Sequence, residues 1–169
     1  MVRSGEVMFS GQQQKLYEKL WVSWQDIVFA DYCAGVLLKK GWHAHPWERR
    51  GTIYQQQVAF TTALITAYAR PFARSRGWPT LPPDLIAAYD DQEKALHHQM
   101  LRQRNTIYAH SDSSSYSVHP RRFNGFNTAL IRAPSLRISA EEAAMLQTMA
   151  SKLFVAMGEA SDALAKGEI

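Results

Sequence analysis

Apolar residues recur at helical spacing over most of this chain, and that spacing constrains its fold more than any other feature. In the run 12–38 they return every three or four residues, so they share one face of a helix. The positions on this face are Leu16, Leu20, Trp24, Ile27, Ala34 and Leu38. A second set at a neighbouring angle widens the face and predicts a helix that is buried on more than one side. This set is Trp21, Val28, Tyr32 and Val36.

Glycine, proline and helix-capping residues predict where this helix and the next two begin and end. Gly41 should stop the first helix, because glycine readily adopts the left-handed conformation of a helix C-cap. The second helix should begin near Thr52 and bend or end at Pro71, whose ring is incompatible with a helix interior. The third should begin with Asp84 as its N-cap and end near Ser111.

The segment between the third helix and the last one carries mixed signals. The runs "SYSVH" and "TALIR" have the composition of short strands, and "FNGFN" could turn between them. After this segment, Ser139 and Glu142 have the spacing of a capping box, in which each residue satisfies a backbone N–H of the other. Apolar residues then keep helical spacing as far as Leu164, which predicts the clearest helix of the chain.

These elements predict an all-α fold. Four to five helices without a large sheet indicate an up-and-down helical bundle, with a small β-hairpin between about 115 and 136. A chain of 169 residues with 46% hydrophobic content can bury one core, so we expect a single domain over 1–169. No internal repeat is present.

Charge is distributed unevenly along the chain. The range 39–76 contains seven Lys and Arg and one acid, and the range 102–137 contains six Arg and one acid. The range 139–169 contains five acids and two Lys. The basic middle favours a partner that carries phosphate groups. The alternative is a solvated basic face beside an acidic one.

The expected compartment is the cytoplasm. Cys33 is the one cysteine, so no disulfide can form within the chain, which suits a reducing environment. The segment "MVRSGEVMFSGQQQKLYEK" has no apolar run of signal-peptide length, and no uncharged apolar stretch of membrane-spanning length occurs. We therefore expect no membrane association.

The stretch "MLRQRNTIYAHSD", residues 100–112, gathers polar groups where the third helix should end. Arg104 and His110 are six residues apart. On a regular helix they would point about 120° apart and lie about 9 Å apart along the axis. They could converge if the helix ends or kinks near Ala109, or if two copies of it meet about a two-fold axis.

The residue types in this stretch suit chemistry on a phosphodiester. Arg104 is permanently charged and presents a fork of donors to phosphate oxygens. His110 titrates near neutrality and can move a proton, and Asn105 offers a neutral donor and acceptor. Together they could stabilise a transition state without a metal ion. In the alternative interpretation, Arg104 is a surface charge and His110 caps the helix.

The segment "LRQRNTIYAHSD" resembles the signature of the HEPN superfamily. That signature is an arginine, a polar residue that is often asparagine, and a histidine after four to six intervening residues. Here these positions are Arg104, Asn105 and His110, with five residues between Arg104 and His110. The run "AHSD" looks like the ending common in bacterial members, and "AYARPF", residues 67–72, is similar to a Tyr-x-Arg-Pro element of some members.

The resemblance implies a helical bundle that dimerises around the motif helices. It also implies a metal-independent ribonuclease of phage defence or a toxin–antitoxin system, in which Arg104, Asn105 and His110 are catalytic. In such members the RNA 2′-hydroxyl attacks the adjacent phosphate and leaves a cyclic phosphate. The implied partners are a second copy, RNA, and an antitoxin or regulatory protein. Other members are inactive, so the alternatives are an inert protein- or nucleic-acid-binding module and a structural helical dimer.

Three further residues are candidates for substrate binding. His97 lies seven residues before Arg104 and so shares its helix face, and it could supplement the site, although the spacing favours a histidine on a polar face. Arg102 could contact a phosphate or be a solvated charge. Asp112 ends the "AHSD" run of the motif.

A metal site is not expected. His43 and His45 flank Ala44, but no nearby Cys, Asp or third His completes a ligand set. We interpret them as part of an exposed aromatic loop, and Cys33 as a core residue. The sequence therefore predicts no metal and no cofactor.

Overall fold

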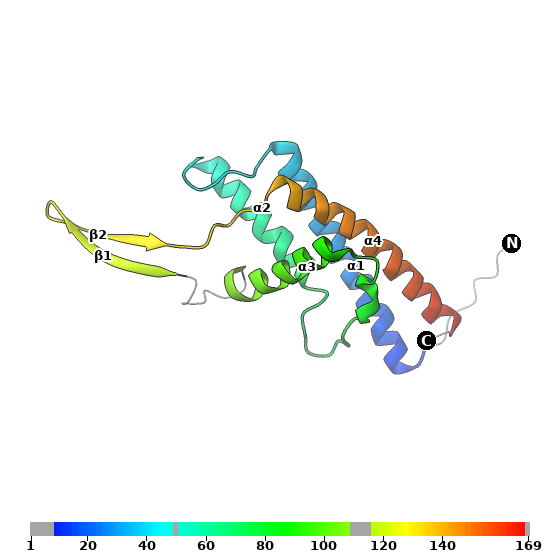
Figure 1. The fold of residues 1–169 in the computed structure, drawn as a ribbon. Helices are drawn as coiled ribbons and strands as arrows, with labels where there is room; N and C mark the ends of the chain where they lie inside the picture. Colours follow the sequence, from blue (N-terminus) through cyan, green and yellow to red (C-terminus); the bar gives the residue numbers. More distant parts are fainter. Residues whose placement is uncertain (1–8, 49–50, 109–115, 168–169) are drawn as a thin grey trace.

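The computed structural model describes residues 9–48, 51–108 and 116–167, which form four long helices and one hairpin (Figure 1). The helices are α1 (Gly11–Lys40), α2 (Thr52–Ala69), α3 (Asp91–Gln103) and α4 (Ala140–Lys166). A 3-10 helix, η1 (Pro83–Ile86), precedes α3, and a π-helical turn, η2 (Arg104–Tyr108), continues it. The hairpin strands are β1 (Ser117–Phe123) and β2 (Phe126–Arg132). A mostly helical fold with one small antiparallel sheet agrees with the predicted helical bundle and hairpin.

The ends of α1 and α4 are fixed by local hydrogen bonds that the sequence encodes. Gly41 adopts φ 60° and ψ 39° after α1, so the predicted stop is confirmed. Ser139 and Glu142 form the predicted capping box of α4, with both backbone N–H groups bonded to side chains. Each cap satisfies donors or acceptors that a helix end leaves free.

The helices pack so that α1 and α3 lie on opposite sides of the bundle. Helix α1 packs along both α2 and α4, and α3 packs on α2 and α4 from the other side. The largest fully buried side chains come from all four helices and from the residue before the α4 cap. They are Tyr68, Leu20, Ile27, Leu37, Leu64, Ile65, Met100, Ile138, Leu146, Met149, Leu153 and Met157. Within the described residues, no helix has the length and apolar character needed to cross a membrane.

The outer side of α1 differs from the prediction. Trp21, Val28 and Tyr32 are 49%, 43% and 59% exposed, so the expectation that this helix is buried on more than one side is wrong for the described chain. Among the described elements, α2 and α4 make the extensive contacts with the helix, and they meet its inner face. The second apolar face of this helix is present, but no described element covers it.

The start of α3 also differs from the prediction. Asp90, not Asp84, is the N-cap, and it forms a capping box in which Asp90 and Glu93 each accept the other's backbone N–H at 2.8 Å. Asp84 lies within η1, where Pro82 and Pro83 favour a short turn. The α-helix ends at Gln103, and the π-helical turn extends it to Tyr108. The predicted end at Ser111 falls outside the described residues.

The hairpin confirms the predicted turn at "FNGFN". Asn124 and Gly125 have φ values of 46° and 85°, which is the conformation that a two-residue hairpin turn requires. The register pairs Phe123 with Phe126 and Ser117 with Arg132. The hairpin projects away from the helices (Figure 1), and almost all of its residues are exposed.

Polar contacts join α3 to α4. The Glu93 carboxylate, on a residue only 4% exposed, accepts hydrogen bonds from Lys152 Nζ at 2.6 and 2.8 Å. Further along α3, Gln99 Nε2 donates to Glu142 Oε1 of α4 at 2.9 Å. These contacts fix the position of α3, and with it the start of the π-helical turn that follows.

We expect Lys152→Ala to lower the free energy of unfolding by about 2 kcal/mol, because it leaves the buried Glu93 carboxylate without its cation. Urea denaturation at neutral pH measures this change. Lys94→Ala, which removes an exposed lysine of α3, is the control and should change stability by less than about 0.5 kcal/mol. Equal losses in the two variants would show that the Glu93–Lys152 contact contributes nothing.

Candidate functional site

The motif begins at the point where α3 changes from an α-helix to a π-helical turn. In a π-helical turn the backbone bonds reach one residue further, so the turn is wider than in an α-helix. Thr106 Oγ1 donates to the carbonyl of Arg102 at 2.9 Å and so uses an acceptor near the start of the turn. The 120° separation of Arg104 and His110 holds only for a regular helix. It no longer applies to this segment.

Arg104 is half-buried against the end of α2. Its Nη1 donates to Oδ1 of the exposed Asn105 at 2.9 Å, so the asparagine helps to orient the guanidinium. Its Nε is buried, and no described residue accepts its hydrogen. Arg104 and Asn105 line a cavity of about 60 Å³ with Phe72 and Leu101. The arrangement holds an arginine whose remaining N–H groups can bind an anion.

The other motif residues cannot be placed beside this pair. His110 and Asp112 lie outside the described residues, so their predicted roles stay predictions. Arg102 is exposed on α3, and its predicted phosphate contact also stays a prediction. Arg104 and Asn105 are therefore the two catalytic candidates that the structure brings together.

His97 is not on a polar face, so that interpretation is wrong. It is 3% exposed, and the edge of its ring meets Phe72 with the ring centres 4.7 Å apart. The residue shares the helix with Arg104, but α3 turns this side toward the core. A substrate would have to enter the core to reach it.

The His97 ring belongs to a buried chain of hydrogen bonds. Its Nδ1 lies 2.9 Å from the Tyr68 hydroxyl, which lies 3.3 Å from the Tyr89 hydroxyl, which donates to the carbonyl of Met149. If each hydroxyl donates one bond, His97 Nδ1–H donates to Tyr68 and Tyr68 donates to Tyr89. Burial, with a smaller effect from His98, lowers the pKa of His97 to about 4. His97 is thus a neutral structural residue at pH 7 that joins α3 to α2 and α4.

The two histidines of "WHAHPW" hold a loop to the segment before α4. Arg137 Nε donates to the carbonyl of His43 at 2.7 Å, and Arg137 Nη1 donates to His45 Nε2 at 2.9 Å. His43 Nδ1 lies 3.1 Å from the carbonyl of Ile138, and the His45 ring stacks on Trp47. Both histidines are half-buried, so the predicted exposed loop is wrong for them. In the described part of the chain, no three His, Cys, Asp or Glu side chains are grouped to hold a metal ion.

The hairpin has two chemically different faces, which the sequence did not reveal without its register. Paired residues share a face, and successive pairs alternate between faces. One face, here called the basic hairpin face, carries Ser117, His119, Arg121, Phe123, Phe126, Thr128, Leu130 and Arg132. The opposite face carries Val118, Pro120, Arg122, Asn127, Ala129 and Ile131. The basic hairpin face thus combines two arginines and a histidine with a pair of exposed phenylalanines at the tip.

Comparison with known proteins does not add to these observations. The chain matches no family model, no curated protein and no solved structure. Function must therefore be argued from the side chains themselves. Among the described residues, the Arg104–Asn105 pair and the basic hairpin face are the candidates for ligand binding.

We expect the protein to lose stability on acidification through His97. Its pKa is about 4 in the folded protein and 6.5 as the ordinary value, so the unfolded chain binds a proton that the folded protein does not. The free energy of unfolding should be highest above pH 6.5 and fall toward pH 4. His97→Gln should lower stability at neutral pH but flatten this dependence, as measured by urea denaturation across that range. His119→Gln, at an exposed position, is the control, and an unchanged slope in His97→Gln would contradict the assignment.

Proposed function

We propose that this chain binds RNA and cleaves it without a metal ion, in the manner of the HEPN ribonucleases that its motif resembles. One observation carries the proposal. A π-helical turn holds the Arg104 guanidinium against a small cavity, bonded to Asn105, at the end of the bundle from which the hairpin projects (Figure 1). Single π-helical turns occur frequently at functional sites.

The division of labour follows from the chemistry of the three motif residues. His110 takes the proton of an RNA 2′-hydroxyl, whose oxygen forms a bond to the adjacent phosphorus while the bond from phosphorus to the 5′-oxygen breaks. The leaving 5′-oxygen takes a proton from the protonated His110, which is thereby regenerated, and the products are a 2′,3′-cyclic phosphate and a 5′-hydroxyl. Arg104 binds the phosphate and stabilises its added negative charge, and Asn105 orients Arg104.

The basic hairpin face is the proposed RNA-binding arm. No acidic residue occurs in either strand, and Arg121 and Arg132 lie on the same face as Phe123 and Phe126. The phenylalanines are 68% and 75% exposed, so unpaired bases could stack on them. Cationic side chains beside exposed aromatic rings favour single-stranded RNA.

The proposed setting follows the family. The protein would act in the cytoplasm as a homodimer, in phage defence or as a toxin paired with an antitoxin or regulatory protein. The buried free thiol of Cys33 suits a reducing compartment. The second candidate is an inactive HEPN-like module, which the same basic hairpin face favours, since RNA binding needs no catalytic His110.

We expect His110→Ala to slow RNA cleavage by about 10² to 10⁴-fold with RNA binding largely intact, because it removes the proton-transfer group. Arg104→Ala should weaken both cleavage and binding, because arginine contacts the charged ground state as well as the transition state. Cleavage of a labelled RNA oligonucleotide in EDTA measures both effects, and the product should carry a cyclic phosphate.

His98→Ala and Arg76→Ala, which remove exposed residues of the same types, are the matched controls and should cleave like the parent. Equal cleavage by the parent, His110→Ala and Arg104→Ala would disprove the motif assignment. A parent chain that binds RNA without cleaving it would instead support the inactive module.

We expect Arg121→Ala to weaken binding to single-stranded RNA more than Arg122→Ala does. The two substitutions remove the same charge from neighbouring residues, but only Arg121 lies on the basic hairpin face. Each lost phosphate contact should reduce the slope of log affinity against log salt by about 0.7. Fluorescence anisotropy across a salt series measures this, and equal effects of the two substitutions would contradict a one-sided RNA surface.

A further inference from the structure

Helix α1 presents an apolar surface to solvent along its outer side. We call this surface the α1 outer face, and its exposed apolar residues are Trp21, Val22, Val28, Phe29 and Tyr32. They are 43–59% exposed, whereas the inner side of the same helix is fully buried. Contiguous exposed apolar surface of this kind marks a contact with another molecule. The sequence pattern points the same way, because it predicts a helix that is covered on both sides.

The α1 outer face is complementary to itself when two copies run antiparallel. With the midpoint between Val28 and Phe29 on a two-fold axis, each residue meets the one equally far on the other side of the midpoint. The facing pairs are Val28 with Phe29, Gln25 with Tyr32, Trp21 with Val36, and Glu18 with Lys39. The apolar pairs lie at the centre, and an acid–base pair lies at each end. Within the described chain, neither Glu18 nor Lys39 has a salt bridge.

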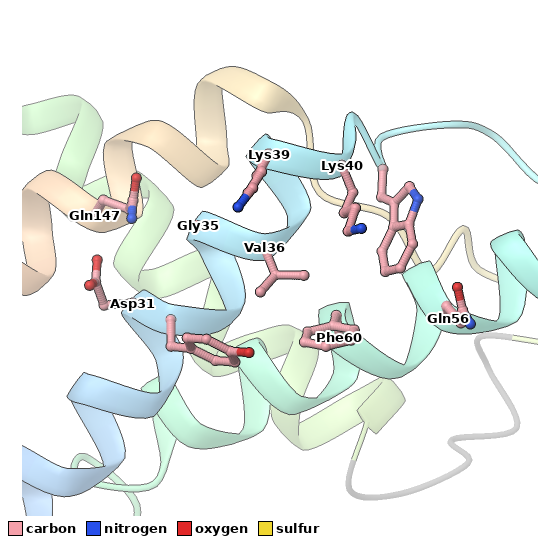
Figure 2. Close-up of a pocket in the computed structure, with 10 residues that line it drawn as sticks. Asp31, Gly35, Val36, Lys39, Lys40, Gln56, Phe60 and Gln147 are labelled. Carbon is pink, nitrogen blue, oxygen red and sulfur yellow. The ribbon is translucent and has the colours of Figure 1, made fainter.

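A hollow beside α1 lies where this register places a tryptophan. The hollow measures about 700 Å³ and is walled by Tyr32 and Val36 of α1, Phe60 of α2, and Trp42. Figure 2 shows Val36 and Phe60 in the hollow, with Lys39 and Lys40 above them in this view. Because Trp21 of one chain faces Val36 of the other, its ring would enter this hollow. Trp21 already contacts the rings of Tyr17 and Trp24, so it is held in place before binding.

We propose that the α1 outer face binds the α1 outer face of a second copy of this chain, antiparallel and in this register. From Glu18 to Lys39 the helix face is about 33 Å long and about 10 Å wide, which gives roughly 330 Å² per chain before the walls of the hollow are added. The two copies together bury roughly 700 Å² before the walls of the hollow are added, which is the size of a weak, transient interface, so we expect a dissociation constant of about tens of micromolar. The proposal names a self-association surface that does not depend on the proposed RNA cleavage, and its test measures mass rather than cleavage.

This contact differs from the one that the family resemblance implies. Helices α1 and α3 lie on opposite sides of the bundle, so pairing through α1 leaves the Arg104 segment of each chain free. A contact between motif helices would be a second, separate interface. Substitutions on α1 therefore lower the assembled mass whether or not the α3 side also associates.

Charge exchange tests both the surface and the register. Light scattering and sedimentation at protein concentrations well above the expected dissociation constant should show that the parent assembles to at least twice 19.2 kDa. Glu18→Lys and Lys39→Glu should each raise the dissociation constant of the α1 contact about ten-fold, because each places like charges opposite one another twice in the dimer. The double variant Glu18→Lys with Lys39→Glu restores both pairs and should regain the parent mass.

Two further variants keep the result decisive. Val28→Asp places two carboxylates at the two-fold axis and should lower the assembled mass. Glu159→Lys reverses the charge of an exposed residue on α4, outside the α1 outer face, and should not change the mass. Circular dichroism confirms that each variant is folded. A parent that stays monomeric, or a mass unaffected by Glu18→Lys and Val28→Asp, overturns the proposal. Single reversals that dissociate without rescue by the double variant overturn the antiparallel register.

Discussion

The burial of the inner face of α1 is the interaction on which the rest of the structure depends. Helices α2 and α4 both pack along this face, while their contacts with α3 are less extensive. Leu20, Ile27 and Leu37 contribute fully buried side chains along its length. Because apolar burial is the dominant favourable term in folding, α1 is the scaffold against which the other helices are placed.

Helix α3 is held more by polar contacts than α1 is, and this difference matters for the site. Its capping box, its contact with Lys152 and its hydrogen bond to Glu142 all have defined directions. The buried chain from His97 to Met149 adds a further oriented link. Directional bonds fix the rotation of a helix about its axis more tightly than apolar packing does. The π-helical turn that carries Arg104 therefore begins from a fixed position on the bundle.

The sequence predicted the elements whose causes are local. Gly41, Ser139 with Glu142, and the "FNGFN" turn act through neighbouring backbone groups, so their spacing is sufficient to identify them. Asp90, rather than the predicted Asp84, caps α3, because Asp90 and Glu93 have capping-box spacing directly before the helix. This spacing is a local signal, so the start of α3 is also predictable from the sequence.

Features that depend on tertiary contacts were beyond the sequence. Helical spacing places His97 on the same face as Arg104, but only the packing of α3 on α2 shows that this face is buried. The sequence also gave no indication of the π-helical turn at Arg104. The two faces of the hairpin could not be assigned either, because a shift of one residue in register exchanges them.

The proline in β1 has a consequence for how this protein avoids aggregation. A free hairpin exposes two outer edges that another strand could join. Pro120 has no N–H to donate and is accommodated in a strand where that position faces outward, so it removes a donor from the outer edge of β1. Arg121 and Arg122 follow it and repel a second copy of the same strand. An exposed arm rich in apolar residues can thus stay available for a ligand without growing into a larger sheet.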